Sequence, residues 1–210
     1  MNFTLPKIYP ITDRRVCGLS HAEQVERLIA GGATIIQLRE KDLSPAEFCE
    51  QAKRALDIAH THNVKIIIND RVDIALAIGA DGVHVGQDDL PPDEARRLLG
   101  PGAIIGTSTH TLEQAAVATQ MSVDYIAIGP IYPTATKENP DPIVGLEMLV
   151  AVRKLIDNKP LVAIGGITAP TASDVLKAGA DSAAIISDVL KDPNHISQTL
   201  VELHNIVANS

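Results

Sequence analysis

Cysteine and aromatic residues are scarce in this sequence of 210 residues. Its two cysteines, Cys17 and Cys49, are too few for a disulfide framework, so we expect reduced thiols. Tryptophan is absent and aromatic residues make up 2% of the chain, which leaves aliphatic side chains to build the core. The apolar runs are shorter than a membrane span, and the first residues lack the pattern of a signal peptide. These absences predict a cytosolic protein.

Acidic residues outnumber basic residues, 26 to 18, and the formal net charge is -8. The chain contains neither a basic stripe nor a series of aromatic stacking residues, which argues against a nucleic-acid or anionic-membrane partner. A small-molecule ligand is the better expectation.

Short β-branched runs alternate with longer amphipathic segments along the whole chain, a pattern typical of repeated βα units and a parallel sheet. The predicted strands are residues 7–12, 34–38, 65–69, 82–85, 104–107, 125–128, 161–164 and 182–186. Apolar residues at helical spacing predict helices such as 45–62 and, at the end of the series, 196–207. The sequence therefore predicts an α/β protein whose residues 1–210 form a single (β/α)8 TIM barrel domain.

An open doubly wound sheet is the alternative fold. The turn after the first predicted strand, residues 10–15, has no G-x-G-x-x-G sequence, which disfavours that alternative. Residues 30–33, 78–83 and 178–183 form a weak internal repeat rich in glycine and alanine. Each copy falls where a helix is predicted to end and a strand to begin, so we interpret the repeat as helix caps without chemistry.

Polar residues gather after the predicted strands, which is where a barrel of this kind builds its active site. Gln37, Arg39 and Lys41 alternate along an extended backbone and would point to one side. Asp70 follows the third strand and Asp89 follows the fourth. Carboxylates from neighbouring strands without a Cys or His cluster favour Mg2+, although an aspartate such as Asp70 or Asp88 could equally be a helix cap.

Later loops add groups that suit anionic ligands. The connection at 129–140 is long enough to be a lid, and in it Thr134, Thr136 and Lys137 offer two hydroxyl groups and a cation. The loops after the seventh and eighth strands, with Gly166 and Ser187, form the usual phosphate site of this architecture. We interpret His84 as a barrel residue whose hydrogen bonds are satisfied, whereas His110 could reach the mouth.

In combination, these motifs resemble those of the thiamine phosphate synthase family along nearly the whole chain. The matching segments are 37–41, 68–71, 84–89, 129–137, 165–167 and 186–187. The resemblance implies that 4-amino-2-methyl-5-hydroxymethylpyrimidine diphosphate condenses with 4-methyl-5-(2-phosphooxyethyl)thiazole to give thiamine phosphate and pyrophosphate. It also implies a Mg2+-dependent dissociative substitution without a protein nucleophile.

The resemblance assigns roles to individual residues. It implies catalytic roles for Arg39, Lys41 and Lys137, and Mg2+ ligation by Asp70 and Asp89. The substrate-binding residues that it implies are Gln37, Leu38, Arg39, Glu40, Lys41, Asn69, Ser108, Thr134, Ala135, Thr136, Lys137, Gly166, Ile186 and Ser187.

Three positions depart from the usual family pattern, namely Thr171, Ser182 and Asp188. We expect them to lie at the phosphate end of the site and to affect thiazole phosphate binding rather than the reaction. We also expect a homodimer, because proteins with this fold commonly form one. The alternatives that the residues leave open are a thiazole tautomerase using His110, a non-catalytic sensor of thiamine precursors, and another phosphate-binding barrel enzyme.

Overall fold

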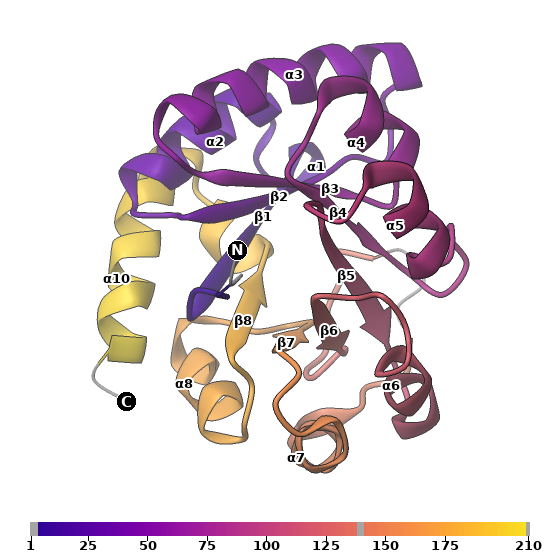
Figure 1. Ribbon diagram of the computed structural model, residues 1–210. Helices are drawn as coiled ribbons and strands as arrows, with labels where there is room; N and C mark the ends of the chain where they lie inside the picture. The colour runs from indigo at the N-terminus through magenta and orange to yellow at the C-terminus, as the bar shows by residue number, and fades with distance from the viewer. Residues whose placement is uncertain (1–3, 138–140, 209–210) are drawn as a thin grey trace.

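The computed structural model describes residues 4–137 and 141–208 and consists of a closed barrel of parallel strands surrounded by helices (Figure 1). The strand order β1-β2-β3-β4-β5-β6-β7-β8 returns to β1, so each strand pairs with its neighbours in sequence. The strands are β1 (Ile8–Asp13), β2 (Ile35–Arg39), β3 (Lys65–Asn69), β4 (Gly82–Val85), β5 (Ile104–Thr109), β6 (Tyr125–Ile128), β7 (Leu161–Ile164) and β8 (Ser182–Ile185). The predicted (β/α)8 barrel is confirmed, and β3, β4, β6 and β7 have the predicted bounds at both ends.

Helices cover the outside of the barrel. They are α1 (Arg14–Cys17), α2 (His21–Ala30), α3 (Pro45–Thr61), α4 (Val72–Ile78), α5 (Pro92–Leu99), α6 (Leu112–Ala118), α7 (Gly145–Ile156), α8 (Ala169–Lys177), α9 (Ser187–Leu190) and α10 (Ile196–Ala208), with a 3-10 turn η1 (Pro193–His195). Ser44 begins α3 with a capping box, in which its hydroxyl accepts from the Glu47 amide and Glu47 accepts from the Ser44 amide. In the described part of the chain, no helix has both the length and the apolar character needed to cross a membrane.

The hydrophobic core has two layers. The larger layer lies between the sheet and the helices, and it includes the α3 residues Phe48, Ala52 and Leu56, which the helical spacing predicted to be buried. The smaller layer fills the inside of the barrel with side chains of alternate strand residues, such as Tyr9 and Tyr125. The barrel interior is therefore packed below the mouth and is no channel.

Gly106 on β5 makes room for the Tyr125 ring inside the barrel. A β-carbon at position 106 would lie 2.0 Å from the Cζ atom of Tyr125, and that ring is fully buried. The Gly106→Ala substitution should therefore lower the free energy of unfolding by about 3 kcal/mol, at the upper end of overpacking costs. Urea denaturation followed by circular dichroism measures this change.

Gly102 provides the matched control, because a β-carbon there would meet no atom within 4 Å. The Gly102→Ala variant should unfold at the same urea concentration as the unsubstituted protein, or at a slightly higher one. Equal midpoints for the two alanine variants would contradict the packing argument for Gly106.

Three aspartates at the amino ends of strands hydrogen-bond the neighbouring strand. Asp81 accepts from the Ile66 amide at 2.8 Å, and Asp124 and Asp181 accept in the same way from the amides of Ile105 and Leu161 at 2.7 and 2.8 Å. Each carboxylate also pairs with a cationic side chain, as Asp124 does with Arg96 at 2.7 Å. Asp81 and Asp181 belong to the repeated segments 78–83 and 178–183, so these contacts give those two copies a structural role.

Candidate active site

A cavity of about 450 Å³ opens at the carboxyl ends of the strands, the end at which the sequence predicted a site. Thirteen of the expected site residues line it, and they come from the loops after seven of the eight strands or from the strand ends themselves. They are Gln37, Arg39, Lys41, Asn69, Asp70, Asp89, Ser108, Thr134, Thr136, Lys137, Gly166, Ile186 and Ser187. The fold therefore brings together groups that lie up to 150 positions apart, from 37 to 187.

Three of the expected substrate-binding residues do not line the cavity. Leu38 is fully buried and packs in the layer between sheet and helices, because consecutive strand residues face opposite sides. Ala135 is exposed. Glu40 points its carboxylate away from the cavity and into the loop that follows β2.

The Glu40 carboxylate organises this loop. One of its oxygens accepts from the backbone amides of Lys41 and Asp42, each at 2.8 Å, and the other lies 3.2 Å from the buried ring of His21. Burial opposes ionisation of this carboxyl, yet the hydrogen bonds from His21 and the loop amides hold its pKa well below the ordinary value. Glu40 therefore stays ionised and fixes the backbone that carries Lys41 at the mouth.

Cationic side chains surround the mouth, and each has an acidic partner. Arg39 pairs with the buried Asp13, and Lys41 pairs with Asp70. Lys137 donates to Asp141 at 2.8 Å. Asp13 and Asp141 were not among the expected site residues, although Asp13 directly follows the predicted strand 7–12 and that position could have signalled it. The pairs hold three cations in place beside one opening.

Asp70 and Asp89 form an acidic pair in the same opening. Asp70 adopts a left-handed conformation with φ 60°, which is uncommon outside glycine and recurs at functional positions. Burial raises the pKa of the Asp89 carboxyl, and the neighbouring Asp70 carboxylate raises it further. A cation between the two carboxylates would relieve this repulsion.

The donor set suits Mg2+. The part of the chain that the structure describes contains no group of three or more histidine, cysteine, aspartate and glutamate side chains around one metal position. A Mg2+ ion needs no such group when it binds one or two carboxylates together with phosphate oxygens and water. Asp70 and Asp89 therefore fit this ion.

The floor of the cavity is apolar with a few polar groups. Ile11, Ile164 and Ala184 supply aliphatic surface there. His84 reaches this floor and lies 2.8 Å from the Ser108 hydroxyl and 3.0 Å from the Tyr125 hydroxyl. Burial lowers the pKa of His84 from 6.5 to about 4, so the ring is neutral at pH 7. The interpretation of His84 as a satisfied barrel residue is confirmed.

Glycines shape the side of the cavity next to β7. Gly166 has φ 65°, and a β-carbon there would lie 2.3 Å from the Pro133 carbonyl oxygen. Any larger residue would displace the loop after β6, which carries Thr134 and Thr136. That loop is described up to Lys137, and the end of the predicted lid, residues 138–140, lies outside the described residues.

The three departures from the family pattern lie at different places. Thr171 belongs to a capping box at the start of α8, and Asp188 accepts from the Ala169 amide at 2.8 Å. Both are therefore close to the β7 and β8 loops. Ser182 instead begins β8, at the end of the strand opposite to the mouth, so our expectation that it touches the phosphate end was wrong.

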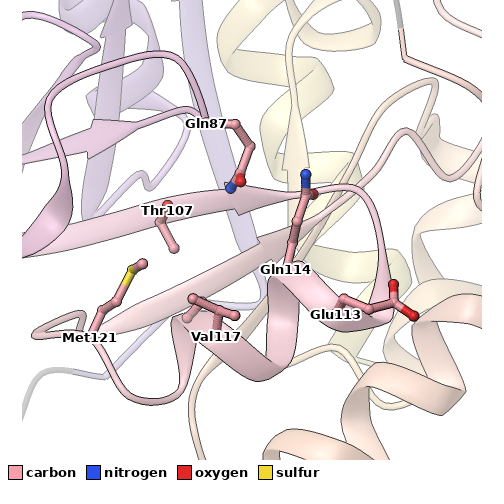
Figure 2. A pocket seen from close by; sticks show the side chains of 7 residues that line it. Gln87, Thr107, Glu113, Gln114, Val117 and Met121 are labelled. Carbon is pink, nitrogen blue, oxygen red and sulfur yellow. The ribbon is translucent and has the colours of Figure 1, made fainter.

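A second pocket, of about 210 Å³, lies on the outer flank of β5 and α6 (Figure 2). Figure 2 shows the side chains of Met121 and Val117 in the lower part of the view and the amide groups of Gln87 and Gln114 above them. Among the residues that the structure describes, the lining of this pocket includes the charged residue Glu113 and no cation. This pocket therefore does not suit a phosphorylated ligand, in contrast to the cavity at the mouth.

Comparisons with known proteins agree with this geometry. Residues 8–189 match the family model for thiamine monophosphate synthase. The chain is 48% identical over 209 residues to the thiamine-phosphate synthase of Koribacter versatilis, covering 96% of this chain and 97% of that protein. It is 44% identical to the thiamine-phosphate synthase of Chloroflexus aurantiacus, covering 88% and 85%. The solved thiamine phosphate pyrophosphorylase of Pyrococcus furiosus superposes with a TM-score of 0.86 at 36% identity, covering 97% and 96%.

Proposed function

The chain belongs to the thiamine monophosphate synthase family, and from this premise we propose how its cavity makes thiamine phosphate. It is a transferase of thiamine biosynthesis that joins a hydroxymethylpyrimidine diphosphate to a thiazole phosphate and releases pyrophosphate. The observation that carries the residue assignment is the position of three cations and two carboxylates at the mouth, above an apolar floor. The charged diphosphate suits the cations at the mouth, and the ring suits the apolar floor beneath them.

The pyrimidine diphosphate spans the depth of the cavity in this proposal. Gln37 comes two residues before Arg39 on β2, and Lys41 lies in the loop that follows this strand, so Gln37 lies deepest. The ring then lies near Gln37 and Ser108, and the diphosphate lies at Arg39, Lys41 and Lys137, with Asn69 beside it. Such charge-assisted contacts to phosphate oxygens are stronger than neutral hydrogen bonds.

Asp70 and Asp89 would hold a Mg2+ ion against the diphosphate. When bound, the ion neutralises phosphate charge and so helps the pyrophosphate to leave. The raised pKa of Asp89, which burial and the nearby Asp70 carboxylate cause, supports a shared cation at this position. Lys41 also pairs with Asp70, so the same lysine can contact the metal-binding carboxylate and the diphosphate.

The thiazole phosphate occupies the side of the cavity formed by the later loops. Thr134 and Thr136 supply hydroxyl groups, and Gly166, Ile186 and Ser187 supply the wall between β7 and β8. The thiazole ring then faces the carbon from which pyrophosphate leaves, and its nitrogen attacks that carbon. The reaction needs no protein nucleophile, so positioning and charge stabilisation account for the rate.

Two wider expectations belong to this proposal. The protein acts in the cytosol, and it forms a homodimer in solution. Neither is needed for the site as described, because one chain supplies every residue assigned above.

The decisive measurement is pyrophosphate release from the purified protein given both substrates, with Mg2+ and with a chelator. We expect release that requires both substrates and stops when the chelator removes the ion. Omission of either substrate is the control. If a folded protein that binds both substrates released no pyrophosphate, the synthase assignment would fail and a sensor would replace it.

A further inference from the structure

Five polar side chains form a continuous hydrogen-bond relay through the inside of the barrel. It runs from Gln37 to Tyr9 at 3.3 Å, from Tyr9 to Tyr125 at 3.2 Å, from Tyr125 to His84 at 3.0 Å, and from His84 to Ser108 at 2.8 Å. The five residues come from five different strands, and the two tyrosines are at most 1% exposed. Both ends of the relay, Gln37 and Ser108, line the cavity, whereas the two tyrosines do not.

The protons along this relay can be arranged in two ways, and these run in opposite directions. In the structure, the Gln37 side-chain amide donates to the Tyr9 hydroxyl. The arrangement consistent with this donation is one in which Tyr9 donates to Tyr125 and Tyr125 donates to Nδ1 of His84. Nε2 of the neutral ring carries its proton and donates to Ser108. The Gln37 carbonyl oxygen and the Ser108 hydroxyl proton are thereby left for a ligand.

The two ends are coupled by this arrangement. If the Gln37 amide turned over, Tyr9 would have to donate to it, and every bond along the relay would reverse. Ser108 would then donate to His84 and offer only an acceptor to the cavity. One end is therefore an acceptor whenever the other end is a donor.

The protonation states needed for the relay are stable near neutral pH. Burial raises the pKa of both Tyr9 and Tyr125, so both phenols keep their protons. His84 is buried, and its two ring nitrogens face the uncharged hydroxyl groups of Tyr125 and Ser108, an environment that favours the neutral ring. A protonated imidazole would donate at both nitrogens and could not accept from Tyr125.

We propose that Tyr9, Tyr125 and His84 are positioning residues that present Gln37 as an acceptor, and so select a pyrimidine bearing an amino group over an oxo-pyrimidine. The proposal rests on the proposed function, which places the pyrimidine ring beside Gln37. An amino group donates to the Gln37 carbonyl oxygen. An oxo group would bring two acceptors together and leave both without a hydrogen bond in a buried place, which is costly.

The test compares the binding of 4-amino-2-methyl-5-hydroxymethylpyrimidine diphosphate with that of its 4-oxo counterpart, by calorimetry with Mg2+ and without thiazole phosphate. We expect the unsubstituted protein to bind the amino compound at least about tenfold more tightly, as one unmet buried hydrogen bond implies. In Tyr9→Phe, Gln37 loses the acceptor that fixes its amide, and the ratio should fall to about threefold or less. Tyr125→Phe should lower the ratio in the same way.

Tyr132→Phe is the matched control, because it removes a hydroxyl group that takes no part in the relay, and its ratio should equal that of the unsubstituted protein. Thermal melting establishes that each variant is folded. If Tyr9→Phe does not fold, the binding ratio of Tyr125→Phe tests the proposal. An unchanged ratio in a folded relay variant would overturn the proposal. A protein that releases pyrophosphate but binds both compounds equally would overturn the relay alone, whereas one that binds neither would overturn the proposed function as well.

Discussion

Replacing Lys137 by alanine should lower the turnover number by about 100- to 1000-fold while the protein remains folded. The reason is that the lysine ammonium group stabilises negative charge that grows on the leaving pyrophosphate, and removal of one such preorganised donor costs this much in other enzymes. Because the contact strengthens in the transition state, KM for the pyrimidine diphosphate should change far less than the turnover number. Steady-state pyrophosphate release measures both constants.

Lys154 supplies the control for this prediction. It lies exposed on α7 and does not line the cavity, so Lys154→Ala removes the same charge from the surface. Its turnover should match that of the unsubstituted protein. Near-normal turnover in Lys137→Ala would remove Lys137 from the mechanism and leave it as the partner of Asp141 only.

Replacing Asp70 by asparagine should raise the Mg2+ concentration for half-maximal activity by at least about 100-fold. Loss of a group that only supports a metal ligand commonly costs 10- to 100-fold in affinity, and Asp70 is proposed as a ligand itself. Calorimetric titration of Mg2+ in the presence of pyrophosphate should show the same loss, independently of turnover. The substitution also removes the carboxylate that pairs with Lys41.

Asp57→Asn on the exposed face of α3 is the matched control, because it removes an aspartate charge far from the mouth. Its Mg2+ dependence should be unchanged. If Asp70→Asn bound Mg2+ as tightly as this control, the ion would have to bind elsewhere, and the acidic pair would need another explanation.

The arrangement of strands and helices was largely predictable, because it depends on periodicity. Buried parallel strands are short and rich in Ile, Val and Ala, and an aspartate directly precedes three of them, β4, β6 and β8. The cavity was predictable for a related reason, since closing the barrel brings the carboxyl ends of all strands to one rim. Residues such as Arg39 and Asp89 then had to lie near one another.

The relay and the orientation of Glu40 were not predictable in the same way. Tyr9 and Tyr125 are 116 positions apart, and nothing in either local pattern indicates that two phenol groups meet inside the barrel. In the sequence, Glu40 lies between Arg39 and Lys41 in one run of charged residues, so it is as hydrophilic as they are. Only the turn of the loop decides that its carboxylate faces backbone amides rather than the cavity. Tertiary contacts, not local sequence, determine both features.

The three aspartates at the amino ends of strands link six of the eight strands into three equivalent pairs. Each one joins the second strand of a pair to the first, namely β4 to β3, β6 to β5 and β8 to β7. A side-chain partner of each aspartate comes from the helix before the first strand of that pair, as His60, Arg96 and Arg153 do from α3, α5 and α7. Helix, strand, helix and strand are thus tied together as one module, repeated three times around the axis. A break in the chain between two modules would leave these ties intact, whereas a break inside a module would separate the two strands that its aspartate joins.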